Sequence, residues 1–301
     1  SVNVWNGTAP DATKVTLGPW NLQGDDYIMY AFKNVDSFSK FGGYTGNGDA
    51  NGPIIETGFE PAWVMVKRTN TISNWVIYDN KRNTTNPRFS YVLANESSAE
   101  TGTAGVAAPQ LDFLSNGFQP SGTEGYVNAN GDNYIYMAFA ADPDTEAPTV
   151  AKSFSTVTYT GNGQDGRSIT GLGFSPSFVW TKERSSTSGH VLFDVIRGAG
   201  NQIVSNLTDA QTSGTNRLQS FDSDGFTIGT SGAQNANGDT YVGWAWKADD
   251  NEPTIYGGAA KAVYKFEDNA NDVRGNYNGT TSNITYTTGK FNKAAVFVES
   301  N

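Results

Sequence analysis

A run of apolar and aromatic residues, preceded by a Gly/Asn turn and followed by polar residues, occurs three times along the chain. The copies occupy residues 21–36, 128–143 and 235–250, and successive copies are 107 positions apart. An apolar run of this length is typical of a strand that is buried on both faces. Because the same strand recurs at a fixed period, we predict a series of like domains.

A second pattern lies between these copies and also repeats. In residues 58–68, Trp63 and Met65 alternate with valines, and this period of two predicts a half-buried strand. The same segment recurs 115 positions later, as residues 173–183. The number of residues between equivalent positions of the two repeats falls from 115 to 107 along the unit. This is expected where strands keep their register and loops lose residues. No helix of ordinary length is predicted.

These patterns predict an all-β fold of tandem β-sandwich domains, jelly-roll-like in topology and arranged in a string. The predicted segments are the C-terminal part of an incomplete repeat at 1–37, β-sandwich repeats at 38–145 and 152–250, and the truncated start of a different domain at 259–301. Half a sandwich exposes unpaired strand edges. We therefore expect further sequence or another chain to complete the first segment.

Composition agrees with a β-rich fold and narrows the range of partners. Aromatic residues make up 13% of the chain and 34 residues are glycine, and pleated sheets favour aromatic residues. The net charge of −10 does not suit the basic surface that binds nucleic acid, so no nucleic-acid partner is expected. No apolar run reaches the length of about 18 residues that spans a bilayer, so no membrane insertion is expected.

Catalytic groups are scarce in the sequence. The chain has no cysteine and one histidine, His190, so it lacks the parts of Ser-His-Asp, Cys-His and histidine–metal sites. Trp75 stands at the equivalent position of the preceding repeat, which indicates that His190 fills space. We predict no catalytic residue, no cofactor and no enzymatic activity. One enzymatic hypothesis remains beside the non-enzymatic ones given below: a pair of carboxylates could cleave a polysaccharide, because 30 acidic residues are present.

One charged pair recurs in both repeats at the same spacing. Asp79 with Arg82, and Asp194 with Arg197, each follow a predicted strand. A carboxylate beside a guanidinium could grip a sugar ligand. The pair could instead close a tight turn, with the arginine satisfying the aspartate or backbone carbonyls, and we favour this second interpretation.

Turns rich in Asp, Asn and Gly provide the candidate metal ligands, although a resident metal is not predicted. The candidates are Asp49, Asp132, Asp165 and Asp239. Their oxygens could coordinate Ca²⁺, but the spacing of an EF-hand is absent. The same residue types serve the local hydrogen bonds and positive φ angles of turns.

Several tryptophans could stack on the faces of sugars. The candidates are Trp63, Trp75, Trp180, Trp244 and Trp246. Most lie on predicted buried or alternating strands, so we predict that most belong to the core.

The order of motifs in residues 15–250 resembles the tandem repeat of bacteriophage tail-fibre and related virion proteins. The motifs are a YTGNG turn, a GF-x-P strand, the Asp-x-x-Arg turn, an F-x-[SD]-[ND]-GF segment and the N-x-x-G-x-x-Y strand, as at residues 44–48, 58–68, 79–82, 113–118 and 128–134. The resemblance implies a non-enzymatic structural protein of a phage virion, a tail or head fibre. Its sandwiches would space or present a tip that binds the host surface.

The last residues resemble the opening of a laminin-G or concanavalin-A-like lectin domain. The matching positions are Phe266, Asn269, Asp272, 278–280, 289–291, Ala295 and Phe297. This resemblance implies a receptor-binding module, truncated in this sequence.

The resemblance also implies partners and a location. A fibre protein lies on the virion surface, contacts other virion proteins, and forms a homo-oligomer, either a trimer or a filament. A host cell-surface glycan is the implied ligand. The alternative function is a carbohydrate-binding adhesin or a polymerising extracellular surface filament protein, in which exposed loops at equivalent positions form a cleft.

Overall fold

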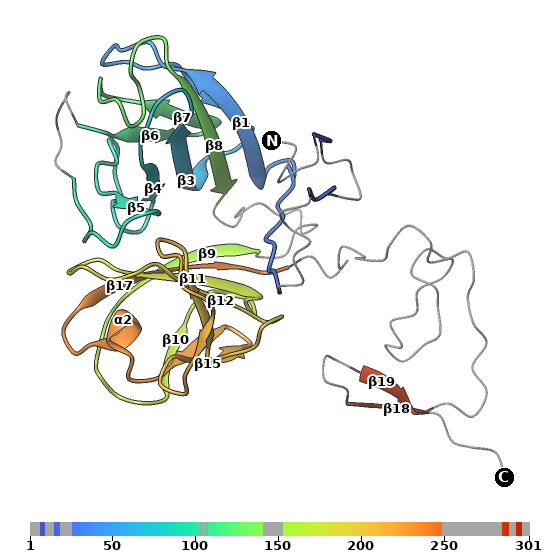
Figure 1. Cartoon of the computed structure of the whole chain (residues 1–301). Helices are drawn as coiled ribbons and strands as arrows, with labels where there is room; N and C mark the ends of the chain where they lie inside the picture. Colours follow the sequence, from blue (N-terminus) through green and yellow to red (C-terminus); the bar gives the residue numbers. More distant parts are fainter. Residues whose placement is uncertain are drawn as a thin grey trace. The chain divides into compact units, whose positions relative to one another are not determined.

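The computed structural model describes residues 7–9, 15–18, 26–102, 105, 108–140 and 153–248, together with the backbone of two strands at 285–288 and 293–296. Residues Asp25–Asp250 form one compact unit, and Ser1–Gly24 with Asn251–Asn301 form another. Two β-sandwiches make up the first of these units (Figure 1). The predicted all-β fold of tandem sandwiches is confirmed.

The first sandwich contains eight strands in two sheets. They are β1 (Ser39–Thr45), β2 (Ile55–Glu56), β3 (Pro61–Arg68), β4 (Trp75–Asp79), β5 (Val92–Leu93), β6 (Leu111–Leu114), β7 (Gly117–Pro120) and β8 (Asn133–Ala140). The large sheet has the order β1-β8-β3-β4-β5, and the small sheet has the order β2-β7-β6.

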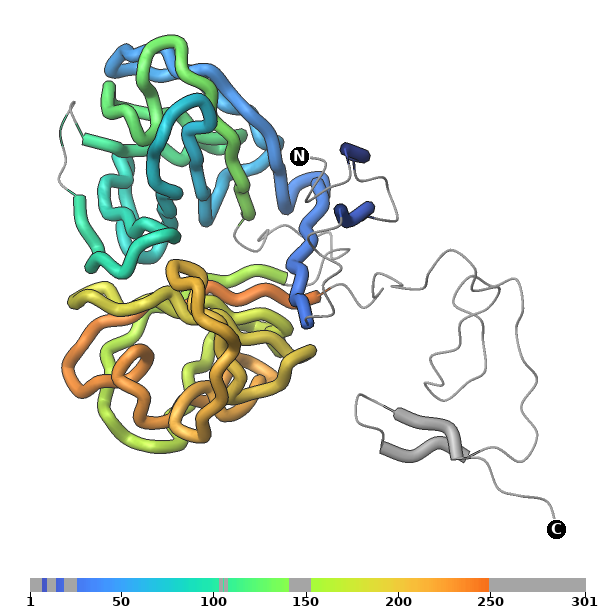
Figure 2. The backbone as a smooth tube through the Cα atoms, viewed as in Figure 1, coloured from blue at the N-terminus to red at the C-terminus, as the bar shows by residue number. Residues whose placement is uncertain are grey.

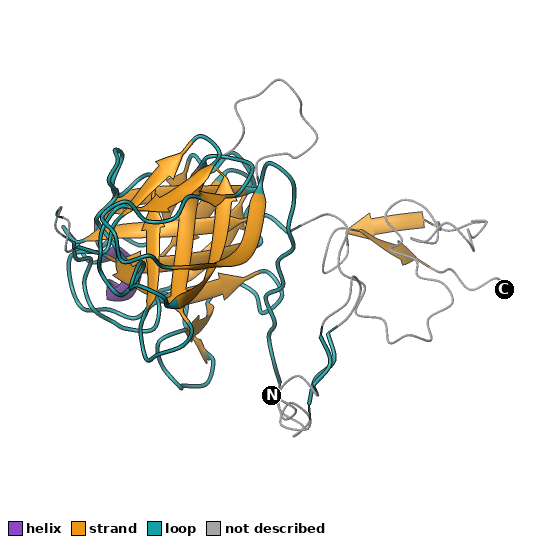
Figure 3. Ribbon diagram, turned by 90° about the horizontal axis from the view of Figure 1, so that it is seen from above, coloured by secondary structure: helices purple, strands orange, loops and turns teal. Residues whose placement is uncertain are grey.

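The second sandwich repeats this plan. Its elements are β9 (Phe154–Thr160), β10 (Arg167–Thr170), β11 (Phe178–Glu183), β12 (Val191–Asp194), β13 (Asn201–Val204), β14 (Thr212–Ser213), β15 (Leu218–Asp222), β16 (Gly225–Ile228), α2 (Gly232–Asn235) and β17 (Thr240–Trp246). The large sheet has the order β14-β13-β12-β11-β17-β9, and the small sheet has the order β10-β16-β15. The one-turn α2 is the purple element among orange strands in Figure 3.

The outer pairings of each sandwich are those of a jelly roll, in which the first strand pairs with the last. β1 pairs with β8 and β2 with β7, and correspondingly β9 pairs with β17 and β10 with β16. Towards the centre the strands pair as local hairpins, β3 with β4 and β6 with β7. Long-range pairings therefore close each sandwich, and short turns build its interior.

The glycine of the Thr-Gly-Asn-Gly turn is required by a close backbone approach. Gly161 donates its N–H to Asp239 O at 2.7 Å. A Cβ at Gly161 would overlap the carbonyl of Ala236. This contact ties the first hairpin of the sandwich to the turn before β17, which explains why both motifs recur together.

The apolar residues form three layers rather than two separate cores. One cluster fills the first sandwich and another fills the second. A third cluster, here called the inter-sandwich layer, joins the two large sheets: Ala62, Trp63, Met65, Ile77, Val92, Ala94, Phe139, Phe154, Phe178, Leu192, Val242, Trp244 and Trp246. The sandwiches follow one another along the chain, but they pack face to face through this layer.

The inter-sandwich layer changes the environment of β3. Alternation in residues 58–68 predicts a half-buried strand, yet residues 61–66 of β3 are all buried. Val64 and Val66 point into the first sandwich, while Trp63 and Met65 point into the inter-sandwich layer. The prediction was wrong because the second sandwich covers the face that a lone sandwich would leave in water.

The first copy of the repeated strand also differs from the prediction. Residues 26–34 of this copy form no strand and pair with no strand among the described residues. A tight turn with a bridge between Val35 and Ser39 connects this segment to β1. Figure 2 shows it in blue, running from β1 to the second sandwich. Its aromatic side chains pack against both sandwiches: Tyr30 stacks on Phe178, and Phe32 contacts Phe139 and Trp246.

The second copy also departs slightly from full burial, because Ile135 in β8 is 44% exposed. The third copy, β17, is buried along nearly its whole length. In the C-terminal part, β18 (Thr285–Thr288) pairs with β19 (Lys293–Val296). The remainder of the predicted segment at 259–301 lies outside the described residues, as do residues 1–6, 10–14 and 19–25 of the predicted segment at 1–37.

Candidate functional site

The charged pair of the first Asp-x-x-Arg turn, Asp79 with Arg82, is enclosed in protein. Asp79 Oδ1 accepts hydrogen bonds from the backbone N–H groups of Lys81 and Arg82, at 3.0 and 2.8 Å. Asp79 Oδ2 accepts one from Arg82 Nε at 2.5 Å and one from Trp244 Nε1 at 3.0 Å. Both side chains of the ion pair are 0% exposed. The carboxylate therefore closes its own turn and receives an indole from the other sandwich.

The guanidinium of Arg82 has equally complete partners. Its Nη2 donates to Ile77 O at 2.9 Å and its Nη1 donates to Glu100 Oε2 at 3.1 Å. Glu100 in turn accepts two hydrogen bonds from Arg184 of the second sandwich, at 3.0 and 2.8 Å. The result is a charged network that crosses from one sandwich to the other.

Electrostatics keep Asp79 and Arg82 ionised. Burial by itself would raise the pKa of Asp79, but the charge and hydrogen bonds of Arg82, with the hydrogen bond from Trp244, outweigh burial and lower that pKa. A buried ion pair with all its hydrogen bonds made is costly to break from either side.

The second Asp-x-x-Arg turn has the same plan with a different donor. Asp194 accepts from the N–H of Arg197 at 2.8 Å and from its Nε at 2.6 Å. Asp194 Oδ2, which accepts the bond from Arg197 Nε, also accepts one from the hydroxyl of Tyr30, at 2.8 Å. This hydroxyl takes the place of the indole N–H in the first turn. Arg197 Nη2 donates to Tyr30 Oη at 3.1 Å and to Leu192 O at 3.0 Å. Burial, followed by the bond to Asp194, raises the pKa of Tyr30.

Tyr30 and Trp244 hold the same position in the repeated strand, six residues after the turn glycines Gly24 and Gly238. Each donates a hydrogen bond to the Asp-x-x-Arg turn of another repeat. The equivalence of these two aromatic donors was visible in the sequence, but nothing there indicated which turn each would contact. Both carboxylates are thus buried, with side chains 0% and 4% exposed, and each bonds to its own turn and to an aromatic donor of another repeat.

His190 is part of the same interior. It is 0% exposed, and its Nδ1 accepts a hydrogen bond from Trp180 Nε1 at 2.9 Å. Burial lowers the pKa of His190 to about 3, and the charge of Lys182 acts in the same direction. The imidazole is therefore neutral and packed between rings, at 5.6 Å from Trp180 and 6.5 Å from Trp244.

The four candidate metal ligands lie in separate turns. Asp49 is in the turn that Asn47 Oδ1 caps at 2.9 Å. Asp165 accepts from Gln219 Nε2 at 2.8 Å. Asp132 forms an ion pair with Arg68 and accepts from Asn70 Nδ2 at 2.7 Å, and Asp239 is at the equivalent position in the second sandwich.

Within the described part of the chain, no three His, Asp or Glu side chains come close enough to hold a metal ion together. The candidate tryptophans belong to the interior. Trp63, Trp244 and Trp246 are at most 5% exposed, and Trp75 and Trp180 pack against the inter-sandwich layer. The prediction that most of them are core residues is confirmed.

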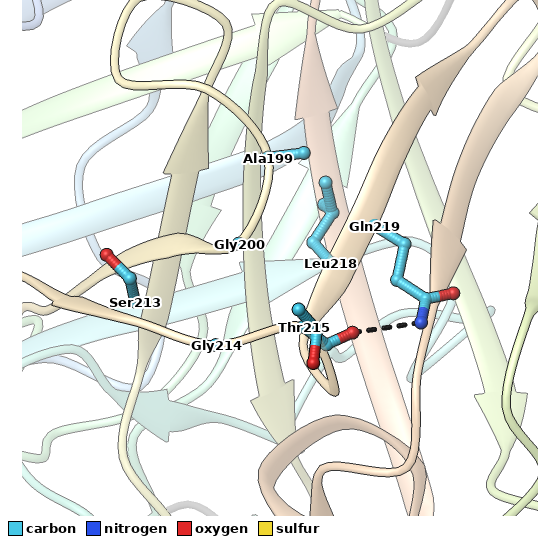
Figure 4. A pocket seen from close by; sticks show the side chains of 7 residues that line it. All are labelled: Ala199, Gly200, Ser213, Gly214, Thr215, Leu218 and Gln219. Carbon is cyan, nitrogen blue, oxygen red and sulfur yellow. Dashed lines mark hydrogen bonds between the residues drawn. The ribbon is translucent and has the colours of Figure 1, made fainter.

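A shallow pocket of about 540 Å³ lies on the second sandwich. Its lining residues are Ala199, Gly200, Ser213, Gly214, Thr215, Leu218 and Gln219 (Figure 4). Gln219 Nε2 donates to the carbonyl of Thr215 at 2.9 Å. The lining holds no charged and no aromatic side chain, so the pocket offers hydroxyl, amide and backbone groups but no catalytic acid or base.

Among the helices that the structure describes, none has the length and apolar character needed to cross a membrane. A search of curated proteins and a search of solved structures each found no match. A family model matches the chain twice, over residues 1–143 and 149–299, which together cover almost its whole length. The chain therefore belongs to the family described as "Domain of unknown function (DUF7483)".

Proposed function

We propose that this chain is a non-enzymatic structural protein of a phage virion, a tail or head fibre. Its paired sandwiches space or present a tip that binds the host surface. The observation that carries the proposal is the joining of the two sandwiches by one shared aromatic layer and one charged network. A shared layer makes the pair a stiff body, whereas a flexible linker alone would leave the repeats free to move.

The use of the charged and ionisable groups supports the same proposal. Asp79, Arg82, Asp194 and Arg197 bond to their own turns and to neighbouring repeats, and His190 is enclosed and neutral. Groups that an enzyme would direct at a substrate are here directed at the protein itself. The order of repeat motifs that resembles tail-fibre proteins supplies the virion setting, with other virion proteins and a host-surface glycan as partners.

The test is the mass and outline of the native assembly, by mass photometry and negative-stain imaging of the full chain. Elongated trimers of one mass support a fibre. Open filaments support the polymerising extracellular surface protein instead, because a heterologous contact that does not close gives a filament. A compact monomer at micromolar concentration argues against both.

A carbohydrate-binding adhesin is the second candidate, and the pocket on the second sandwich is the observation that favours it. Its lining of mostly small residues leaves room for a sugar and includes hydroxyl, amide and backbone groups that can form hydrogen bonds. A glycan array probed with the full chain tests this candidate, with Gln219→Ala as the pocket variant. Binding that the variant loses supports the adhesin, and a blank array counts against it.

A further inference from the structure

One end of the second sandwich differs from the equivalent end of the first at three buried positions. Where the first sandwich has Val66, Arg68 and Val127, the second has Thr181, Glu183 and Gln234. These positions correspond through the repeat spacings of 115 and 107 residues. The second sandwich thus has a hydroxyl, a carboxylate and an amide at positions where the first has two valine side chains and a guanidinium.

The strand register confirms that the two ends are equivalent. Arg68 pairs with Tyr134 between β3 and β8, and Glu183 pairs with Tyr241 between β11 and β17. Both tyrosine hydroxyls accept the N–H of the alanine five residues earlier, at 2.8 and 2.9 Å. The two sandwiches therefore present the same frame around different side chains.

In the first sandwich this end is electrically balanced. Val66 and Val127 are 0% exposed and belong to the apolar core. Arg68 forms an ion pair with Asp132, so the aspartate of the repeated turn has a cation beside it. The side chains of that pair are 24% and 17% exposed.

In the second sandwich the same end is polar and incompletely bonded. Thr181 and Gln234 are 0% exposed and Glu183 is 5% exposed. Thr181 Oγ1, Glu183 Oε1 and both terminal atoms of Gln234 have no hydrogen-bond partner among the described residues. Buried polar atoms without partners are uncommon in native proteins, and such atoms are usually satisfied by a bound water or ion.

These side chains lie at one place in the fold. Thr181 and Glu183 are two residues apart and share a face of β11. The short helix α2, which carries Gln234, packs against β11. Tyr241, opposite Glu183, donates from its hydroxyl to Gly232 O at 2.6 Å, which fixes α2 at this end.

The site carries negative charge that the neighbouring cations do not neutralise directly. Glu183 and Asp239 stand where Arg68 and Asp132 form an ion pair in the first sandwich, so the two carboxylates face each other at this end. Burial raises the pKa of Glu183, and the charge of Asp239 raises it further. Lys182 Nζ donates to the carbonyl of Glu183 at 2.6 Å rather than to its carboxylate. Arg184 is engaged by Glu100.

We propose that Thr181, Glu183, Gln234 and Asp239 form a binding site for a hard divalent cation, with Ca²⁺ as the probe. Such cations take carboxylate, amide-carbonyl and hydroxyl oxygens together with water. In the first sandwich the guanidinium of Arg68 supplies the positive charge at the equivalent place. In the second sandwich a cation bound from solution supplies the positive charge instead. It enters beside the exposed loop at Ser185. The hydroxyls of Ser185 and Ser188 hydrogen-bond to Glu183 and hold its carboxylate at this loop.

The test measures the Tm of the full chain in EDTA and in millimolar Ca²⁺, with isothermal titration calorimetry for the stoichiometry. We expect one Ca²⁺ per chain and a rise in Tm of about 5 °C at a concentration far above Kd. Tb³⁺ luminescence excited through nearby tyrosine rings such as Tyr241 gives a second readout. Glu183→Gln keeps the shape of the side chain and should weaken binding at least about tenfold, since it removes one ligand charge.

The matched control rebuilds the first sandwich in the second. The triple variant Thr181→Val, Glu183→Arg and Gln234→Val should fold, ignore Ca²⁺, and pair its new arginine with Asp239. Asp49→Asn, in an exposed turn of the first sandwich, should keep the full response. No change in Tm and no heat of binding for the wild-type chain would overturn the proposal, since water would then fill the site. A Ca²⁺ response retained by the triple variant would also overturn it.

Discussion

Trp244 in the last strand of the second sandwich donates its indole N–H to Asp79 in a turn of the first, at 3.0 Å. Tyr30 does the same for Asp194 through its hydroxyl, at 2.8 Å. Trp244 lies against Trp63 with ring centroids 6.4 Å apart, and Tyr30 stacks on Phe178, the residue equivalent to Trp63, at 4.4 Å. The same contact is therefore built twice from matching positions of the repeat. It consists of an aromatic side chain that donates a hydrogen bond to the aspartate of another repeat and packs against an aromatic ring there, and it is called the lock below.

Removing the indole donor should destabilise the protein beyond the loss of ring area. Trp244→Phe leaves a buried carboxylate with one hydrogen bond fewer, and a hydrogen bond to a charged group contributes about 2 kcal/mol. Trp246→Phe is the matched control, because Trp246 Nε1 has no hydrogen-bond partner among the described residues. Urea unfolding of both variants should show the larger loss for Trp244→Phe, and equal losses would contradict the lock.

Tyr30→Phe tests the second lock with an almost unchanged shape. The variant keeps the stacking on Phe178 and loses only the hydroxyl between Asp194 and Arg197. We expect a loss of about 1 kcal/mol in the free energy of unfolding. Tyr126→Phe, whose ring contacts Tyr91 and neither Asp-x-x-Arg turn, serves as the control and should lose less stability than Tyr30→Phe.

Asp79→Asn should be among the most damaging single changes in the first sandwich. It leaves Arg82 buried with only Glu100 as a charged partner, and breaking a buried pair from one side costs about 3–5 kcal/mol. The folded-state pKa of Asp79 is lowered, so its ionised form contributes stability above the unfolded pKa of about 3.9 and loses it as pH falls through the folded value. Chemical unfolding from pH 7 to pH 3 should show this acid dependence weakened in the variant.

His190 should make stability fall on acidification within a definite window. Its folded pKa of about 3 lies below the unfolded value of about 6.5, so the unfolded chain binds the extra proton between these values. Stability attributable to His190 is fully present above pH 6.5 and declines by up to about 1.4 kcal/mol per pH unit below it. His190→Gln removes the titrating group. The difference in the free energy of unfolding between the wild type and this variant should therefore be constant at neutral pH and should change as the pH falls below about 6.5. A parallel pair of curves across the window would show that the histidine is not buried as a neutral ring.

The first sandwich produced alone, as residues 38–140, should self-associate. Its face contributed by Trp63, Met65, Ile77 and Phe139 would lose the cover of the second sandwich. Apolar patches of this kind drive association in water. Light scattering should show dimers or larger species for the fragment at concentrations where residues 25–250 give a single copy of the paired unit. A well-behaved monomeric fragment would mean that the inter-sandwich layer is dispensable.

Local pattern in the sequence determined much of the fold. The apolar runs and the alternation at 58–68 specify strands, and Gly-Asn turns specify where they reverse, because these preferences depend on each residue and its near neighbours. The two occurrences of Asp-x-x-Arg were recognisable for the same reason. That Asp79 closes its turn follows from the spacing, since a carboxylate can reach the N–H groups two and three residues ahead.

Only the tertiary structure decided what covers the outer face of each large sheet. Trp63 and Met65 have the spacing of a half-buried strand whether water or another sheet lies against them, so periodicity could not reveal the inter-sandwich layer. The partners Trp244 and Tyr30 come from 165 and 164 residues away in the chain. Burial by distant residues, rather than local sequence, turns the charged pairs into internal contacts, and it leaves Glu183 Oε1 and the side-chain amide of Gln234 without a hydrogen-bond partner among the described residues.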